Sequence, residues 1–241
     1  MDLSGFHPTR RRLIRALLLG ACVSPAMAAI LKAGSTVAKE PVTQGFQKVV
    51  GDVRLNGAQA RVGHVVRPGD ICTTGADSEC IIIVGEQVFL LRALSEIAFD
   101  LDYFGDGRDT SFGGRLRITA GAVMAVFGDL RAETTVTTPL ATVGIRGTGL
   151  YVEVWPEKNY VCLCYGKAVL HSKLNPDFEE TLDTFHHESP RNFYAKPEQH
   201  DGLFVEPEKM INHEDEELIM LEALVGRIPL FGPEPIKMPD Q

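Results

Sequence analysis

The stretch from residue 137 to residue 165 constrains the fold more than any other part of this sequence. Residues 150–154 read Leu-Tyr-Val-Glu-Val, and such an alternation places one set of side chains on each face of a β-strand. Three glycines stand just ahead of this strand, where a residue without Cβ lets the backbone bend or bulge. Turn residues at 155–159 then reverse the chain, and residues 160–165 return with strand-forming side chains. The sequence therefore predicts a β-hairpin.

Short strands separated by turn signals fill the rest of the region between residues 46 and 172. Asn56-Gly57 is a strong hairpin signal, and Arg67-Pro-Gly-Asp70 is typical of a type II turn. Residues 71–73 and 80–84 flank a Gly-Ala-Asp-Ser turn, so we expect them to pair as antiparallel strands. Turn signals at about ten-residue spacing, without a helix-period segment between them, predict an all-β fold, an antiparallel β-sandwich or β-roll.

Residues 173–241 have a different character and are expected to form an acidic C-terminal extension. Residues 176–241 hold 16 acidic and 5 basic side chains, whereas residues 29–175 hold 15 of each sign. One amphipathic helix is expected at about 213–225, with Asn212 as its N-cap. A neutral body with an acidic extension argues against nucleic acid and anionic membranes as partners, because both need a basic face.

The first 28 residues have the pattern of a cleaved export signal. Arg10 and Arg11 resemble a twin-arginine signal, although general secretory export stays open, and a small-residue site predicts cleavage between Ala28 and Ala29. An acylated Cys22 is the less favoured alternative, since the apolar run ahead of it is short. No later run is long enough to span a membrane. We therefore expect a periplasmic or secreted protein that is not an integral membrane protein after cleavage, with residues 29–45 as a linker.

Several motifs in the hairpin region match a known pattern. They are Thr138-Pro139, Ala141-Thr-Val-Gly-Ile-Arg146 with Gly147-Thr148, and Tyr165-Gly-Lys-Ala-Val169. Residues 46–172, which contain them, resemble the FecR domain, the periplasmic module of ferric-citrate-type signal transducers. The resemblance implies a non-enzymatic interaction or signalling role with a protein or cell-envelope partner, and it brings no catalytic residue and no cofactor.

Four residues of these motifs are expected to act structurally: Pro139, Arg146, Gly147 and Thr148. A full ferric-citrate-type regulator has a cytoplasmic anti-sigma region ahead of its membrane span, whereas only twelve residues precede Leu13 here. We therefore expect a FecR-like module without that region, and the sequence does not predict that it controls a sigma factor.

Four cysteines remain after the signal is removed, and an even count in an exported chain favours disulfides. Cys72 and Cys80 flank a turn, so the sequence predicts a disulfide between them across a hairpin. Cys162 and Cys164 lie on the same face of one strand and cannot easily bridge each other. If the strands stack in space, either of them could instead pair with Cys72 or Cys80.

Histidines gather in the acidic extension and define an alternative function, a metal- or small-ligand-binding periplasmic protein. The histidines are His186, His187, His200 and His213. Their spacing matches no known ligand pattern, so the sequence predicts no metal-ligating, cofactor-binding or catalytic residue. The zinc-protease pattern also fails, because Glu217 stands where the second histidine belongs. The leading hypothesis is a non-enzymatic FecR-like interaction module of the cell envelope.

Overall fold

The computed structural model describes residues 44–104, 112–128 and 134–236, and for residues 101–104, 112 and 113 it describes the backbone only. The expected signal peptide, its cleavage site at Ala28 and Ala29, Cys22 and almost all of the expected linker lie outside these residues. Within the described part of the chain, no helix has the length and apolar character that a membrane crossing requires.

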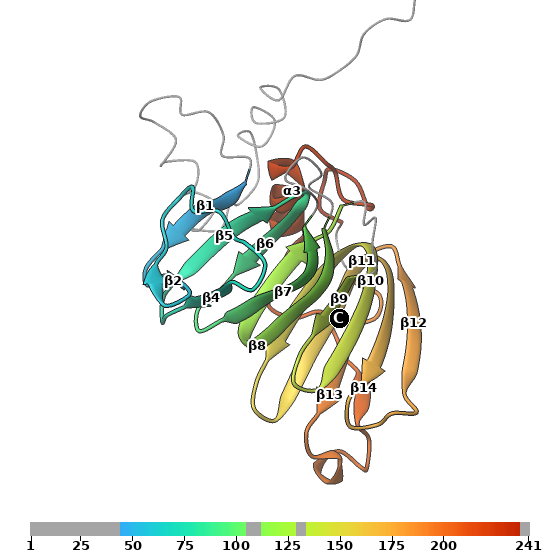
Figure 1. Ribbon diagram of the computed structural model, residues 1–241. Coiled ribbons are helices and arrows are strands. Elements are labelled where there is room, and N and C mark those ends of the chain that lie inside the picture. The colour runs from blue at the N-terminus through green and yellow to red at the C-terminus, as the bar shows by residue number, and fades with distance from the viewer. Residues whose placement is uncertain (1–43, 105–111, 129–133, 237–241) are drawn as a thin grey trace, which may run out of the picture. The chain divides into compact units, whose positions relative to one another are not determined.

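The described residues are mostly β-strand, with one α-helix near the C-terminal end (Figure 1). This confirms the predicted all-β class with a single C-terminal helix. The elements are β1 (Gly45–Val50), β2 (Val53–Leu55), β3 (Ala58–Gln59), β4 (Ile71–Thr74), β5 (Glu79–Val84), β6 (Gln87–Leu91), β7 (Glu96–Phe104), β8 (Phe112–Val126), β9 (Thr134–Thr137), β10 (Ala141–Val154), β11 (Lys158–Ser172), β12 (Glu179–Thr184), β13 (Arg191–Tyr194), η1 (Pro197–Gln199), β14 (Val205–Pro207) and α3 (Asp215–Leu224).

The strands form one extended sheet in the order β14-β13-β11-β10-β9-β8-β7-β4-β2-β3, with β1, β5, β6 and β12 pairing off this path. Most ladders are antiparallel, as expected, but β8 and β9 run parallel. The sheet branches at β8, because this strand is long enough to pair with four other strands. Its first half pairs with β7 and β9, and its second half pairs with β6 and β10.

The predicted hairpin is the longest ladder of the sheet, formed by β10 and β11. The register of this ladder shifts between Arg146 and Gly149, where Gly147 adopts φ +56° and leaves the chain bulged. Gly166 faces this bulge on β11 with φ +93°, and a Cβ there would come within 2.5 Å of the Gly147 carbonyl oxygen. The close approach of the two backbones therefore requires a glycine at position 166, whereas a Cβ at Gly147 would meet only the Gly128 carbonyl oxygen, 3.9 Å away.

The other motif residues lie around the same hairpin. Thr148 is fully buried, and Arg146 and Pro139 are exposed. The Thr138 hydroxyl accepts a hydrogen bond from the Ala141 backbone N–H at 2.9 Å, which fixes the turn into β10. This hydrogen bond gives Thr138 a local structural role.

Two hydrophobic cores lie on opposite faces of the strands, which explains the continuously apolar run in β5. Ile82 belongs to one core, while Ile81 and Ile83 belong to the other. A strand buried on both faces needs apolar residues at every position rather than at alternate ones. The second core is covered by α3, whose Leu218 and Leu221 are fully buried.

The helix α3 lies within the expected range, but its cap differs from the prediction. Glu214, and not Asn212, is the N-cap, because Glu214 and Glu217 form a reciprocal capping box. Glu217 also accepts two hydrogen bonds of 2.8 Å from Arg92. The helix is thereby anchored to the chain that follows β6.

The C-terminal extension does not stand apart from the sheet. Strand β12 pairs with β11, β13 pairs with β11, and β14 pairs with β13. The polar sequence of β12 hides its strand character because only one of its faces is covered: Leu182 and Thr184 are buried, and Asp183 between them is exposed. The β-structure therefore continues beyond the expected boundary at residue 172.

Candidate functional site: a buried cysteine–histidine cluster

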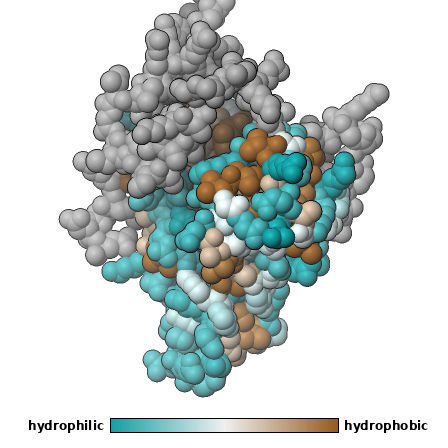
Figure 2. Space-filling view, turned by 90° about the vertical axis from the view of Figure 1, so that its left-hand side faces the viewer, coloured by the Kyte–Doolittle hydropathy of each residue, from teal (hydrophilic) through white to brown (hydrophobic). Residues whose placement is uncertain are grey.

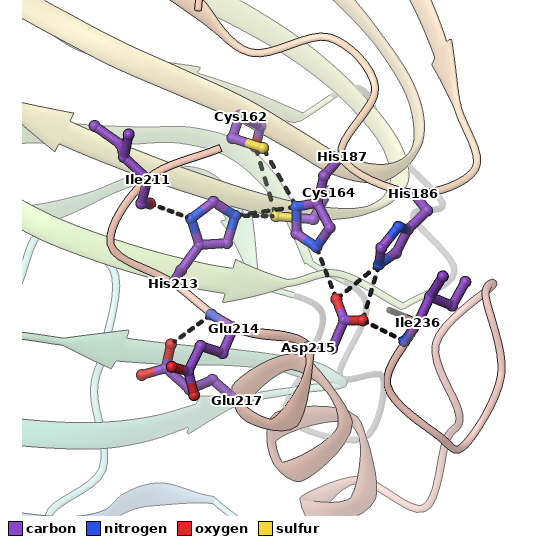
Figure 3. Close-up of polar contacts among 10 residues, drawn as sticks. All are labelled: Cys162, Cys164, His186, His187, Ile211, His213, Glu214, Asp215, Glu217 and Ile236. Carbon is purple, nitrogen blue, oxygen red and sulfur yellow. Dashed lines mark hydrogen bonds and ion pairs between the residues drawn. The ribbon is translucent and has the colours of Figure 1, made fainter. Parts of the chain in front are cut away.

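Four side chains with metal-ligating chemistry meet beneath the C-terminal segment (Figure 3). Cys162 and Cys164 lie two positions apart on β11 and so share one face of that strand. His187 lies in the connection between β12 and β13, and His213 lies just ahead of α3. Both cysteines are fully buried, and the two histidines are 3% and 4% exposed. We call these four residues the cysteine–histidine cluster.

The donor atoms of the cluster point at one another. The Cys162 Sγ lies 3.5 Å from the His187 Nδ1, and the Cys164 Sγ lies 3.5 Å from the His213 Nε2. The two ring nitrogens, His187 Nδ1 and His213 Nε2, are 3.1 Å apart. All four donor atoms lie within 4.8 Å of one another. They therefore enclose a single small volume.

The backbone is bent at two points to aim these histidines. His187 has φ +47°, and Asn212, next to His213, has φ +56°. Residues other than glycine rarely adopt positive φ, and where they do, the surrounding contacts hold them there. The His187 backbone N–H donates to the Cys164 carbonyl oxygen at 2.9 Å. This bond ties the loop that carries His187 directly to β11.

Asp215, at the first turn of α3, organises the outer side of the cluster. Its carboxylate accepts from the His187 Nε2 at 3.0 Å, from the His186 Nε2 at 2.8 Å and from the Ile236 backbone N–H at 2.8 Å. Asp215 is itself 6% exposed. One carboxylate thus connects the cluster, the helix and the last described residues of the chain.

His213 is fixed from two sides. Its Nδ1 lies 2.6 Å from the Ile211 carbonyl oxygen. The ring stacks on Tyr151 of β10, with centroids 4.3 Å apart and planes tilted by 25°. The Tyr160 hydroxyl donates to the Lys209 carbonyl oxygen at 3.0 Å, which holds the incoming chain against β11. The position and orientation of the His213 ring are therefore set by its surroundings.

The environment lowers the pKa of one of the two thiols and raises the pKa of the other. Burial alone would raise the pKa of Cys162, but hydrogen bonds from Cys164, His187 and His213 outweigh burial and hold that pKa well below its usual range. Burial and the neighbouring Cys162 raise the pKa of Cys164. Burial opposes protonation of His187, yet its hydrogen bond to Asp215 raises its pKa to about 9. Thiolate character is therefore favoured at Cys162.

The chemistry of this arrangement is that of a metal ligand set. Among the described residues, two overlapping groups could hold an ion: the cysteine–histidine cluster, and the set His186, His187 and Asp215. Both groups use His187, which offers a different ring nitrogen to each. The sequence predicted no metal-ligating residue, so this cluster is a site that sequence reasoning missed.

Three of the four histidines noted in the sequence come together here, and His200 does not. His200 instead stacks on Tyr194, with ring centroids 3.4 Å apart. The sequence placed the two cysteines on one face of a strand, and their spacing from the histidines fits no linear ligand pattern. The sequence feature that could have identified this site is a pair of cysteines on one strand face together with histidines in the following segment.

The predicted Cys72–Cys80 disulfide is not formed in this structure. Both thiols are free and buried, and their Sγ atoms lie 3.9 Å apart, whereas a disulfide needs about 2.05 Å. The strand pairing behind the prediction is wrong, because β4 pairs with β2 and β7 while β5 pairs with β1 and β6. The two thiols nevertheless face each other inside the first core.

No protein-family model matches the chain, and no curated protein matches it. Two crystal structures of proteins named as candidate anti-sigma factors from Parabacteroides distasonis are similar to it. The first is 14% identical over 58% of this chain and 59% of that chain, with a TM-score of 0.43. The second is 15% identical over 63% of this chain and 64% of that chain, also with a TM-score of 0.43. The chain therefore spans less than two thirds of either structure, and this likeness identifies no family.

Proposed function

We propose that this chain is a non-enzymatic FecR-like interaction module of the cell envelope that binds a protein partner through residues 224–236. The observation that carries the proposal is the exposure of large apolar side chains in this short segment. Leu224, Ile228, Leu230 and Ile236 are 40%, 57%, 58% and 38% exposed. Single exposed apolar residues are ordinary, but several close together mark an interaction surface. Patches of apolar side chains are also visible on the face drawn in Figure 2.

This segment is held in place even though its apolar side chains face outward. Phe231 is 8% exposed and packs edge-on against Tyr165 and His186, with ring centroids 5.8 Å and 5.0 Å away. Arg227 pairs with Glu222 at 2.6 Å and donates to the Glu86 carbonyl oxygen. A surface fixed in advance loses less conformational entropy when a partner binds. These contacts favour a preformed docking surface.

The charge of the surrounding region indicates the chemistry of the partner. The 16 acidic and 5 basic side chains of residues 176–241 favour a protein with basic side chains around an apolar contact. Charges of opposite sign accelerate association and exclude wrong partners. We therefore expect binding that weakens as the salt concentration rises.

The double variant Ile228→Ser/Leu230→Ser is expected to lose partner binding while keeping its fold, because both side chains are exposed. The measurement is cross-linked capture from the cell envelope at low and high salt. The matched control is Val62→Ser/Val65→Ser, which removes two apolar side chains that are 50% and 53% exposed elsewhere on the molecule. Equal capture by both variants, or equal loss, would contradict the proposed surface.

Export is part of this proposal and has its own test. The intact mass of the envelope protein is expected to begin at Ala29. Replacing Arg10 and Arg11 by lysine is expected to leave precursor in the cytoplasm if the twin-arginine route is used. A mature mass that retains Met1, or one that carries an acylated Cys22, would contradict soluble release.

A further inference from the structure

We propose that Cys162, Cys164, His187 and His213 bind one Zn²⁺ ion in a closed tetrahedral site that fastens the C-terminal segment to the sheet. This proposal is independent of the partner proposed above, since it rests on the geometry of the cysteine–histidine cluster alone. Two cysteines and two histidines are a common ligand set of structural zinc sites.

The distances between donor atoms agree with a tetrahedral zinc site. Zn–S bonds of about 2.3 Å and Zn–N bonds of about 2.0–2.1 Å at tetrahedral angles place sulfur and nitrogen about 3.5 Å apart, and two nitrogens about 3.3 Å apart. The observed sulfur–nitrogen distances are 3.5 Å and 3.5 Å, and the nitrogen–nitrogen distance is 3.1 Å. The side chains already stand close to where the ion requires them.

The outer hydrogen bonds orient both imidazoles for metal binding. His213 faces the Ile211 carbonyl oxygen with Nδ1, and His187 faces the Asp215 carboxylate with Nε2. Both partners accept hydrogen bonds, so each ring carries a proton on its outer nitrogen. Its inner nitrogen is then the one that offers a lone pair when the imidazole binds a metal ion in its neutral form. At 3.1 Å the two inner nitrogens need a positive charge between them, either a bridging proton or a metal ion.

Metal-ligating histidines usually donate their second N–H to a carboxylate or a backbone carbonyl, which fixes the tautomer and strengthens the ligand. Both histidines of the cluster have such a partner. Asp215 is therefore assigned to this outer layer rather than to the ligand set. Its oxygens already accept from His186, His187 and the Ile236 N–H.

The ligand set favours zinc over the other common ions. Ca²⁺ and Mg²⁺ prefer oxygen ligands, whereas thiolate and imidazole suit zinc, and zinc does not change oxidation state. Four protein ligands and nearly complete burial leave no open position for a substrate. The ion would therefore act as a structural link between β11, the β12–β13 connection and the segment that leads into α3.

The test uses the full chain, purified, stripped of metal and titrated with Zn²⁺ and separately with Co²⁺. We expect one equivalent of zinc by elemental analysis. Bound Co²⁺ should show the visible bands of tetrahedral coordination and a near-ultraviolet sulfur-to-cobalt band with the intensity of two thiolates. Absence of stoichiometric metal, octahedral cobalt bands, or iron or copper in place of zinc would overturn the proposal. This measurement on the unmodified chain needs no variant to fold.

Variants then identify the ligands. Cys162→Ser is expected to weaken zinc binding at least 100-fold and to remove about half of the sulfur-to-cobalt band, and His213→Gln to weaken binding to a similar degree. The matched controls are Cys72→Ser, a buried free cysteine of the other core, and His200→Gln, a histidine outside the cluster. Zinc binding that survives Cys162→Ser, or that falls equally in the controls, would show that other groups hold the ion.

Discussion

Removing the Zn²⁺ ion proposed at the cysteine–histidine cluster with a chelator is expected to lower the melting temperature of the protein by about 10 °C. A ligand that binds only the folded state contributes about 4 kcal/mol at a concentration a thousand times its dissociation constant. In a chain of this size, each kcal/mol corresponds to about 2–4 °C. The measurement is calorimetry on the zinc-loaded protein with and without chelator. Cys162→Ser is the control, because it should already melt low and should not respond to the chelator.

Unfolding after removal of the ion should begin locally. Residues 208–236 are held by the cluster, by Leu218 and Leu221 in the second core and by the Arg92–Glu217 ion pair. Without the ion, we expect this segment to open before the rest of the sheet unfolds, since its remaining polar ties at this point are the contacts of Asp215 with His186 and His187 and of His213 with Cys164 and His187. Trypsin should then cleave faster after Lys209 and Arg227. A chelated protein that has lost its zinc but keeps its melting temperature and its resistance to trypsin would contradict a structural role for the ion.

The second large effect is expected from Gly166→Ala, with a loss of stability of about 3 kcal/mol or more. Gly166 has φ +93°, and a Cβ there would approach the Gly147 carbonyl oxygen to 2.5 Å and the Thr148 Cα to 3.1 Å. Both contacts involve backbone of the paired strand, which cannot rotate away as a flexible side chain can. Denaturant unfolding of the two proteins gives the difference directly.

Gly202→Ala is the matched control for this prediction. Gly202 has a similar φ of +81°, but a Cβ there meets nothing within 4 Å. This variant carries the backbone strain without the steric clash, so we expect a loss of about 1 kcal/mol. If the two variants lose the same stability, the close approach of β10 and β11 at the bulge does not limit the fold.

Local sequence patterns were enough to predict the elements that residues close in the sequence form: a hairpin, a turn and the helix. The alternation at residues 150–154 and the turn after it predicted the β10–β11 hairpin, and Asn56-Gly57 predicted the β2–β3 turn. The amphipathic pattern after His213 placed α3 within a few residues. In each case residues that are close in the sequence form the backbone hydrogen bonds of the element, and their own spacing sets its apolar face. The local sequence is therefore sufficient to predict the element.

The pairing of distant strands was decided only by the tertiary structure. Cys72 and Cys80 flank a turn, yet β4 pairs with β2 and β7 while β5 pairs with β1 and β6. The polar strand β12 was hidden in the acidic extension, since one covered face gives a weak apolar signal. Linear spacing does not report which strands lie side by side.

The cysteine–histidine cluster also depends partly on local sequence and partly on tertiary structure. The sequence by itself established that Cys162 and Cys164 share one face of a strand and that histidines gather in the C-terminal extension. It did not establish that His187 and His213 turn inward onto those two thiols while His200 turns away to Tyr194. That selection depends on the β11–β12 pairing and on the packing of α3 against the second core. A binding site assembled from three separate segments exists only when the sheet that carries them has formed.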